Sequence, residues 1–325
     1  MKFIDITEKT LIDEIKKEFS SLRPGLSLGI GDDAAVIKAG KKQLLLTKDL
    51  LLDGIHFYKD AHPPFLLGRK SLNVSLSDIA AMGGTPLYAL LGLGLPENTS
   101  GEWIEGFFSG IKSAAEEFDT ALAGGDISRA GGMTLSVTVI GEGKNIIKRS
   151  GARPGDMICV SGKLGDSAQG LRLLNQGAGL GDDQRNDVLL KAFFDPVPQV
   201  VLGKIISEKK IASSMIDVSD GLSVDLNHLC EESGVGAEIY EEKIPVSDEV
   251  RFYQKKDREI CLHGGEDYSL LFTVPEEKKS RLKLLVKEYD ISEIGRMIRG
   301  KDIILIKENG QRKKLEIGGY QHFFR

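Results

Sequence analysis

Six short acidic segments recur along the 325-residue chain, and each of them contains glycine. They occupy residues 29–34, 47–56, 77–84, 124–126, 217–221 and 264–267. Two carboxylates about 4 Å apart repel by roughly 4 kcal/mol at an effective dielectric near 20. A fold that gathers these groups therefore needs cations, and Mg²⁺ prefers carboxylate oxygen and often accompanies a polyphosphate. The pattern predicts a site for Mg²⁺ and phosphate.

Any one of these segments is typical of an ordinary turn, because Asp beside Gly is standard turn chemistry. The prediction depends on their number, and on several carboxylates following apolar runs where a strand would stop at a turn. Asp78 is the hardest to explain as a turn residue, because it falls inside an expected helix where Asp has poor propensity. Asp220 has two open interpretations, the N-cap of the following helix or a metal ligand.

Three well-known nucleotide motifs do not account for the pattern. Gly29 to Ala34 matches G-x-G-x-x-A formally, but that fingerprint needs a helix to begin at the glycines, and Ala34–Ile37 has the pattern of a strand. A Walker A motif is absent, since Ser161-Gly-Lys163 is followed by leucine. The protein-kinase motifs are absent as well. Any nucleotide phosphate is therefore expected to bind through metal ions.

Composition bounds the class of protein. The length allows two domains, and we place their boundary at the polar, turn-rich segment near residue 148. Net charge is −5 with no basic block, so no nucleic-acid partner is expected. The longest apolar stretch, Leu87 to Leu95, is too short to span a membrane. The three cysteines form no C-x-x-C pair, which favours a reducing cytoplasm.

Apolar periodicity predicts the elements that position the acidic segments. Helices are expected over Thr10 to Phe19, Phe65 to Met82, Trp103 to Phe118, Asp166 to Leu174 and Leu222 to Glu232. Strands are expected at 34–37, 43–47, 87–95, 133–140, 157–160, 211–216, 268–274 and 302–307. Mixed helices and strands in both halves predict two α/β or α+β domains.

With these elements in place, the chain resembles the thiamine-monophosphate kinase family, in the superfamily that includes aminoimidazole ribonucleotide synthetase. The resemblance runs from about Gly29 to Tyr320 in the family's order. It is carried by segments 29–36, 49–57, 73–84, 124–126, 149–156, 216–222, 264–268 and 319–323. It implies the two-domain fold of that superfamily: an N-terminal domain (1–148) that dimerises through its sheet and binds metal and nucleotide, and a C-terminal α+β domain (149–325).

The resemblance also implies an activity, the ATP-dependent phosphorylation of thiamine monophosphate to thiamine diphosphate with several Mg²⁺ ions. The matching metal ligands are Asp33, Thr47, Lys48, Asp49, Asp78, Asp126, Asp217 and Asp220. The residues expected to meet ATP are Gly125, Asp126, Arg149 and Ser219. The residues expected to face thiamine monophosphate are His56, Glu266 and Tyr320.

Two positions depart from the family pattern. Lys48 stands where the family often has threonine, so its backbone carbonyl rather than its side chain would serve a metal. Ile127 replaces a usual threonine, which weakens any hydroxyl role there.

The residues alone leave several alternatives open. Arg149 is either a surface arginine or a partner for ATP phosphate, and His56 either a core histidine or a ligand contact. Glu266 is either a polar residue of a turn or a partner for the cationic thiazolium. Tyr320 is either a packing aromatic or a ring that stacks on a flat heterocycle.

Rival functions make different demands on the sequence. A selenide-activating relative needs a reactive Cys or Sec in a glycine-rich N-terminal segment, and a hydrogenase-maturation relative needs a C-terminal cysteine, whereas this chain ends Phe-Phe-Arg325. A purine-precursor cyclase is harder to exclude by chemistry. From another class, a non-catalytic Mg-nucleotide sensor would bind ATP without turnover.

Overall fold

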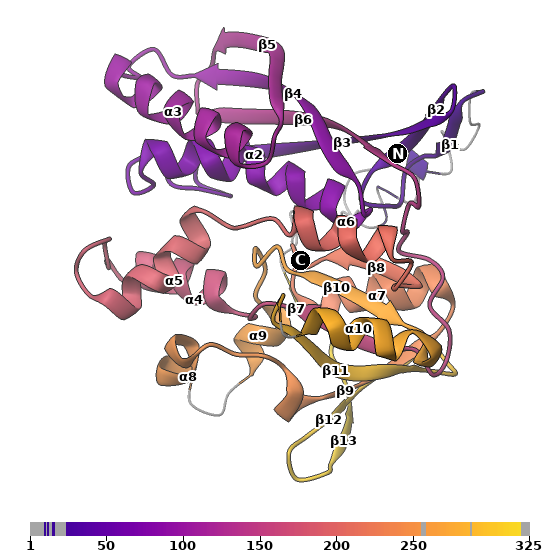
Figure 1. The fold of residues 1–325 in the computed structure, drawn as a ribbon. Helices are drawn as coiled ribbons and strands as arrows, with labels where there is room; N and C mark the ends of the chain where they lie inside the picture. Colours follow the sequence, from indigo (N-terminus) through magenta and orange to yellow (C-terminus); the bar gives the residue numbers. More distant parts are fainter. Residues whose placement is uncertain are drawn as a thin grey trace.

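The computed structural model describes residues 24–254, 258–286 and 288–319, together with Thr10, Ile12, Ile15 and Lys16. The helix expected over Thr10 to Phe19 therefore lies largely outside the described residues, and Tyr320 lies wholly outside them. Two sheets with helices packed against them make up the described part of the chain (Figure 1).

The first sheet has six strands in the order β1-β2-β3-β6-β4-β5. Only β4 and β5 run parallel, and the other neighbours are antiparallel. The strands are β1 (Leu26–Leu28), β2 (Ala35–Ala39), β3 (Lys42–Leu52), β4 (Thr85–Leu95), β5 (Ala121–Arg129) and β6 (Thr134–Gly143).

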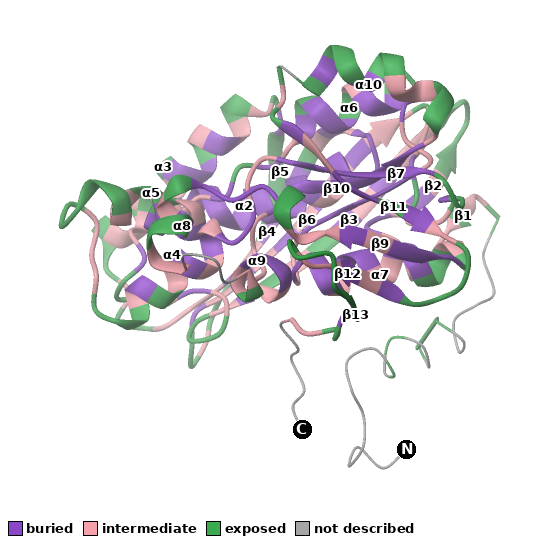
Figure 2. Cartoon of the chain, turned by 90° about the horizontal axis from the view of Figure 1, so that it is seen from below, coloured by how far each residue is buried: buried purple, intermediate pink, exposed green. Residues whose placement is uncertain are grey.

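The second sheet has seven strands in the order β13-β12-β9-β11-β7-β10-β8. Every residue of the neighbouring strands β7 and β10 is buried (Figure 2). Hydrophobic clusters cover both faces of this sheet. The strands are β7 (Met157–Ser161), β8 (Ser214–Asp217), β9 (Gly236–Tyr240), β10 (Leu270–Val274), β11 (Ile291–Ile298), β12 (Ile303–Ile306) and β13 (Arg312–Lys314).

The predicted helices within the described residues are confirmed, but helices α5, α6, α8, α9 and α10 and strands β1, β5, β9, β11 and β13 were not anticipated. The helices are α2 (Pro64–Ala81), α3 (Gly101–Glu117), α4 (Asp166–Asn175), α5 (Gln184–Phe194), α6 (Val200–Glu208), α7 (Leu222–Ser233), α8 (Asp248–Gln254), α9 (Glu259–His263) and α10 (Lys279–Val286). Two 3₁₀ turns are η1 (Glu241–Lys243) and η2 (Glu276–Lys278). No helix within the described ranges has the length and apolar character needed to cross a membrane.

The predicted fold class is confirmed, with mixed helix and sheet in both halves. We propose the domain boundary at residue 148, between β6 and β7.

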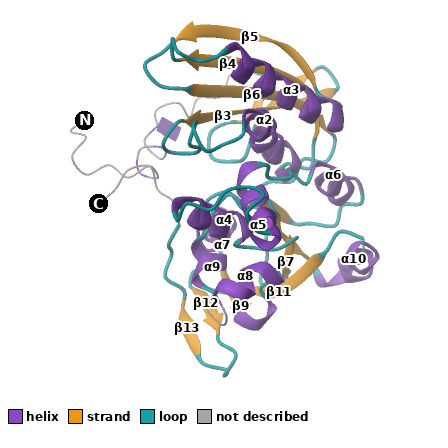
Figure 3. Cartoon of the chain, turned by 90° about the vertical axis from the view of Figure 1, so that its left-hand side faces the viewer, coloured by secondary structure: helices purple, strands orange, loops and turns teal. Residues whose placement is uncertain are grey.

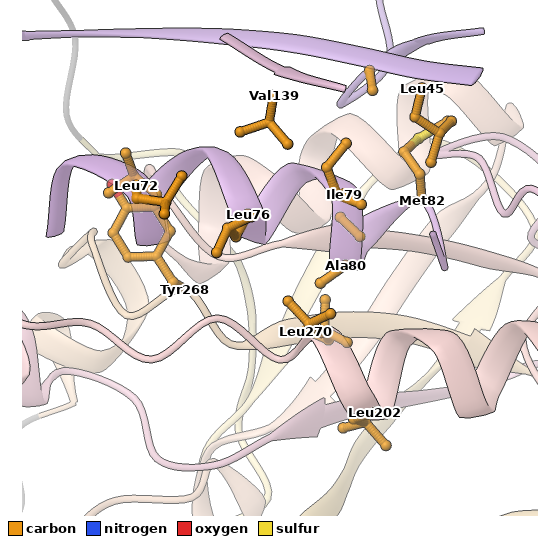
Figure 4. Close-up of a cluster of buried hydrophobic side chains, with 14 of the residues drawn as sticks. Leu45, Leu72, Leu76, Ile79, Ala80, Met82, Val139, Leu202, Tyr268 and Leu270 are labelled. Carbon is orange, nitrogen blue, oxygen red and sulfur yellow. The ribbon is translucent and has the colours of Figure 1, made fainter. Parts of the chain in front are cut away.

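Helix α2 lies between the first sheet and the C-terminal half of the chain (Figures 1 and 3). Leu45 and Val139 pack above it, and Leu202 and Leu270 pack below it (Figure 4). Being covered on both sides, it buries polar residues as well as apolar ones, among them Arg69, Lys70, Asn73, Ser75 and Ser77. Buried polar side chains require partners, so α2 is where polar contacts between the two halves are expected.

Two glycines set the close approach of α2 to α3. A Cβ added at Gly68 would lie 2.0 Å from the carbonyl oxygen of Phe107, and one at Gly110 would lie 1.9 Å from that of Phe65. Any side chain at either position would push the helices apart, so these glycines fix how α2 is seated beneath the first sheet.

Strand β3 runs further than the sequence predicts, and β5 was not predicted as a strand. Asp49 and Asp126 were expected at strand ends, but Asp49 lies within β3 and Asp126 within β5. Strand β3 pairs with β6 along residues 43–52, and β5 pairs with β4 through Gly124, Gly125 and Asp126. Pairing with a long neighbour overrides the poor strand propensity of Asp, Lys and Gly. The expectation that these carboxylates follow strand ends is therefore wrong for both residues.

Candidate active site

Three carboxylates from distant parts of the chain meet beside α2. Asp33 precedes β2, Asp78 lies in the last turn of α2, and Asp217 ends β8. One oxygen of each lies within 4.8 Å of those of the other two. Asp33 and Asp217 are buried and Asp78 is half-buried. The fold thus gathers three of the residues that the sequence singled out, in the manner expected of a cation site.

Hydroxyl groups orient this cluster and the neighbouring Asp49. Thr47 Oγ1 donates a hydrogen bond to Asp78 Oδ2, and Ser77 Oγ donates to Asp217 Oδ2 over 2.6 Å. Ser75 Oγ donates to Asp49 Oδ2 over 2.6 Å. Serines 75 and 77 were not anticipated. Ser75 lies three residues before Asp78, so the two are neighbours on the helix, but the partners of both serines, Asp49 and Asp217, are distant in sequence.

The cluster holds its carboxylates close enough to disfavour full ionisation. Burial, together with the charge of Asp33, raises the pKa of Asp217 to about 7. Burial and the carboxylates of Asp49 and Asp217 raise the pKa of Asp78 well above its ordinary value. Burial also raises the pKa of Asp49. A divalent cation would relieve this repulsion, because it favours the ionised forms.

Arg149 offsets part of the negative charge. Its Nη2 and Nε lie 2.6 and 3.1 Å from Asp33 Oδ1. Asp33 Oδ2 is also buried, yet no partner for it is found among the described residues. A buried carboxylate oxygen without a partner is costly. Together with an all-oxygen donor set, this oxygen fits a Mg²⁺ site at Asp33, Asp78 and Asp217.

A second acidic group surrounds the start of α7. Oxygen and nitrogen atoms of Asp220, Asp225 and His228 lie within 4.8 Å of one another. The N-cap residue of α7 is Gly221, so the N-cap alternative for Asp220 is wrong. Asp225 Oδ2 instead accepts hydrogen bonds from the Asp220 and Gly221 backbone N–H groups, over 3.2 and 3.1 Å. Asp225 was missed because it lies in the first turn of α7, where an acidic residue is an ordinary feature of a helix.

Two expected substrate contacts converge on a lysine that the sequence analysis did not single out. Glu266 Oε1 lies 3.0 Å from Lys70 Nζ, and the His56 carbonyl oxygen lies 3.3 Å from the same atom. His56 Nδ1 accepts a hydrogen bond from the Leu52 backbone N–H. Ser219 lies beside Glu266, because the Ser219 carbonyl oxygen accepts a hydrogen bond from the Glu266 backbone N–H over 2.8 Å.

Lys48, Gly125 and Asp126 lie apart from the buried cluster. Residues opposite each other across strand pairs share a face, and Asp126 pairs with Gly92, Gly92 with Ser136, and Ser136 with Leu50. Asp126 therefore shares the face of Leu50 and Lys48, whereas Asp49 points to the opposite face, toward α2. Lys48 Nζ lies 2.5 Å from Ser136 Oγ. A Cβ at Gly125 would lie 1.8 Å from the Leu91 carbonyl oxygen, so only glycine fits there.

The two halves of the chain match two domains of a known protein family. Residues 31–142 match the N-terminal domain of AIR synthase related proteins, and residues 153–308 match the C-terminal domain. The thiamine-monophosphate kinase of Aquifex aeolicus is 38% identical, covering 99% of this chain and 100% of its own. The thiamine-monophosphate kinase of Escherichia coli K12 is 35% identical, over 97% of this chain and 98% of its own.

Solved structures agree with the sequence comparison. The structure described as AaThiL complexed with AMPPCP and TMP superposes with a TM-score of 0.89, at 38% identity over 99% of both chains. A hydrogenase maturation protein, HypE, in complex with ATP has a TM-score of 0.71 at 20% identity over 98% and 97%, which shows a shared fold. Identity at the level of the Aquifex protein over whole chains establishes the family. The chain belongs to the thiamine-monophosphate kinase family, and its two domains are those of AIR synthase related proteins.

Proposed function

We propose that this protein phosphorylates thiamine monophosphate to thiamine diphosphate, with ATP as the phosphoryl donor and Mg²⁺ as the metal. The observation that carries the proposal is the cluster of Asp33, Asp78 and Asp217, with its partnerless buried oxygen. The names of the relatives, and the presence of AMPPCP and TMP in the AaThiL complex, support the choice of substrates.

The residues present suit this reaction. A phosphate monoester has a second pKa near 6, so the acceptor is largely a dianion at neutral pH and needs no general base. The remaining difficulty is to bring two anions together in line. Bound Mg²⁺ neutralises phosphate charge and so supplies that part of the chemistry. A site rich in aspartate and poor in basic catalysts is consistent with direct transfer, without a phosphorylated enzyme.

We assign the side chains to tasks by position. Asp33, Thr47, Asp49, Asp78 and Asp217 would hold Mg²⁺ beside α2, and Lys48 (through its carbonyl), Asp126 and Asp220 would complete the metal set. Gly125, Asp126, Arg149 and Ser219 would meet ATP, and the Arg149 guanidinium that now engages Asp33 suits a phosphate equally well. His56, Glu266 and Tyr320 would face thiamine monophosphate.

The direct test is to incubate the protein with ATP, Mg²⁺ and thiamine monophosphate and to measure thiamine diphosphate by chromatography. We expect stoichiometric conversion of ATP to ADP, and no ATP consumption without the acceptor. ATP binding without turnover would instead indicate a nucleotide sensor. A phosphorylated protein trapped from labelled ATP in the absence of acceptor would contradict direct transfer.

We further propose that the protein is a cytoplasmic homodimer that pairs through the open face of the first sheet, with no nucleic-acid or membrane partner. On this face Leu50, Tyr88 and Leu90 are 50%, 51% and 42% exposed. Adjacent exposed apolar side chains mark interaction surfaces. Asp126 shares this face, so pairing would bring it under a second copy of the chain.

The dimer is tested by light scattering. We expect twice the mass of one chain for the wild type and the single mass for Leu90→Arg. The matched control is Leu284→Arg, because Leu284 lies on α10 and is 73% exposed, and this variant should remain dimeric. A monomeric wild type would contradict the proposed pairing.

A further inference from the structure

Lys70 is a fully buried lysine next to the acceptor side of the proposed site. It lies in the second turn of α2, and none of its side chain is exposed. Burying an ammonium group is expensive unless it is paired and hydrogen-bonded. The position of Lys70 therefore calls for an explanation beyond packing, since a leucine or methionine would fill an apolar helix face at lower cost.

The Lys70 ammonium joins three segments that are distant in sequence. Nζ lies 3.3 Å from the His56 carbonyl oxygen, 3.1 Å from the Phe193 carbonyl oxygen and 3.0 Å from Glu266 Oε1. An ammonium has three N–H donors, and these three acceptors match that number. Nζ also lies 4.0 Å from the centre of the Phe193 ring, within range of a cation–π interaction.

Glu266 is held from both its backbone and its side chain. Its φ of 64° is unusual for a residue other than glycine. Its N–H donates to the Ser219 carbonyl, and a Cβ at Gly265 would lie 2.4 Å from that same oxygen. Lys70 then fixes the carboxylate through Oε1. The Glu266 side chain is still 23% exposed, so it is accessible to solvent, whereas the Lys70 side chain is not.

Charge balance explains why the residue that pairs with Glu266 is a lysine. Burial lowers the pKa of Lys70, and Glu266 opposes that effect by pairing with the charged form. A carboxylate held by one oxygen keeps a second oxygen for another cation. A neutral residue at position 70 would leave Glu266 Oε1 without this cation and would remove one donor from each of two backbone carbonyls.

We propose that Lys70 is a positioning residue, which holds Glu266 by Oε1 so that Oε2 meets the cationic ring of the acceptor substrate. This inference rests on the proposed function, because it assigns Glu266 to thiamine monophosphate. Lys70 itself touches neither substrate. It sets affinity for the acceptor, and leaves affinity for ATP unchanged.

The test compares Lys70→Met, Glu266→Gln and the double variant. We expect each single variant to raise KM for thiamine monophosphate about tenfold or more, the order expected for one charge-assisted contact. KM for ATP should change by less than about twofold. Because both residues act through one carboxylate, the KM of the double variant for thiamine monophosphate should not exceed that of the worse single variant. Its Tm should exceed that of either single variant, since neither buried charge is left unpaired.

A structural ion pair elsewhere supplies the control. Lys307 Nζ and Glu241 Oε1 lie 2.6 Å apart, and both side chains are partly buried. Lys307→Met, Glu241→Gln and their double variant should show the same order of Tm values with KM for both substrates unchanged. If Lys70→Met loses Tm but keeps the wild-type KM for the acceptor, or if the two effects on KM multiply, the positioning role is wrong.

Calorimetric binding of thiamine monophosphate separates this inference from the proposed function. If the wild type forms thiamine diphosphate and Lys70→Met keeps its affinity, only the positioning role fails. If the wild type binds the acceptor but does not convert it, the kinase proposal fails, and the role of Lys70 is judged on Kd instead of KM. If the wild type does not bind the acceptor, both fail.

Discussion

Asp78→Asn is expected to abolish most turnover while leaving the protein folded. Asp78 is the member of the cluster that accepts from Thr47 and lies near both Asp33 and Asp217. Replacing it removes one anionic ligand from the proposed Mg²⁺ site. Losing one electrostatic stabiliser of a transition state typically lowers kcat by about 10²–10³-fold. We expect a loss of at least that order in thiamine diphosphate formation.

Although Asp78→Asn should lose turnover, its thermal stability should stay the same or rise. Burial and neighbouring carboxylates raise the pKa of Asp78, so its ionised form is unfavourable in the metal-free protein. With a chelator at pH 8, Asp78→Asn should therefore melt at the same temperature as the wild type or higher. Asp248→Asn, an exposed aspartate at the start of α8, is the matched control and should keep wild-type kcat. Full activity in Asp78→Asn would exclude Asp78 as a metal ligand.

The metal-free protein should lose stability as the pH rises, and Mg²⁺ should restore it. The folded-state pKa of Asp217 is about 7, above its ordinary value of 3.8, so the folded chain holds this proton more tightly than the unfolded chain. Stability from such a group is fully present below the unfolded pKa and is lost as the pH rises toward 7. Each pKa unit corresponds to about 1.4 kcal/mol, so the cluster should cost on the order of a few kcal/mol at pH 8.

Mg²⁺ binds the ionised carboxylates, so its effect should depend on pH. At pH 8 a saturating concentration should raise Tm by several degrees, because a ligand at about 100 times its Kd adds about 2.7 kcal/mol to stability. At pH 5, where protons occupy the same oxygens, the shift should be small. The measurement is thermal unfolding with and without Mg²⁺, and K⁺ at matched ionic strength controls for screening. An equal Mg²⁺-induced rise in Tm at pH 5 and pH 8 would contradict a cation site at this cluster. The same rise in Asp217→Asn as in the wild type would also contradict it.

Local pattern was a good guide where a segment forms its own regular structure. The apolar stripe of α2 predicted its ends to within one residue, because a long amphipathic repeat is a strong signal. The mid-strand positions of Asp49 and Asp126 were not predictable in this way. Their neighbours β6 and β4 lie far along the chain, and strand pairing there is decided by those neighbours.

The residues that support the site were also beyond local pattern. Ser75 and Ser77 are unremarkable in a helix until Asp49 and Asp217 are placed beside them. Lys70 looks like a lysine on a helix surface until residues from α5 and from the Glu266 segment cover it. Among the partners of these residues, Asp49, Phe193, Asp217 and Glu266 are all more than 25 positions away in sequence, so no short window contains both members.

The sequence by itself determined the chemistry of this protein. The number of its acidic segments predicted a metal and phosphate site, and their order indicated the family. The residues after Gly29 and Lys163 excluded the dinucleotide and P-loop motifs. The tertiary structure decided which carboxylates share a site. It separated Asp126 from Asp33, Asp78 and Asp217, and it placed Lys70 behind Glu266. The physical reason is that residue type fixes what a group can bind, whereas burial and charge proximity, which set its pKa and its partners, arise only when distant segments pack together.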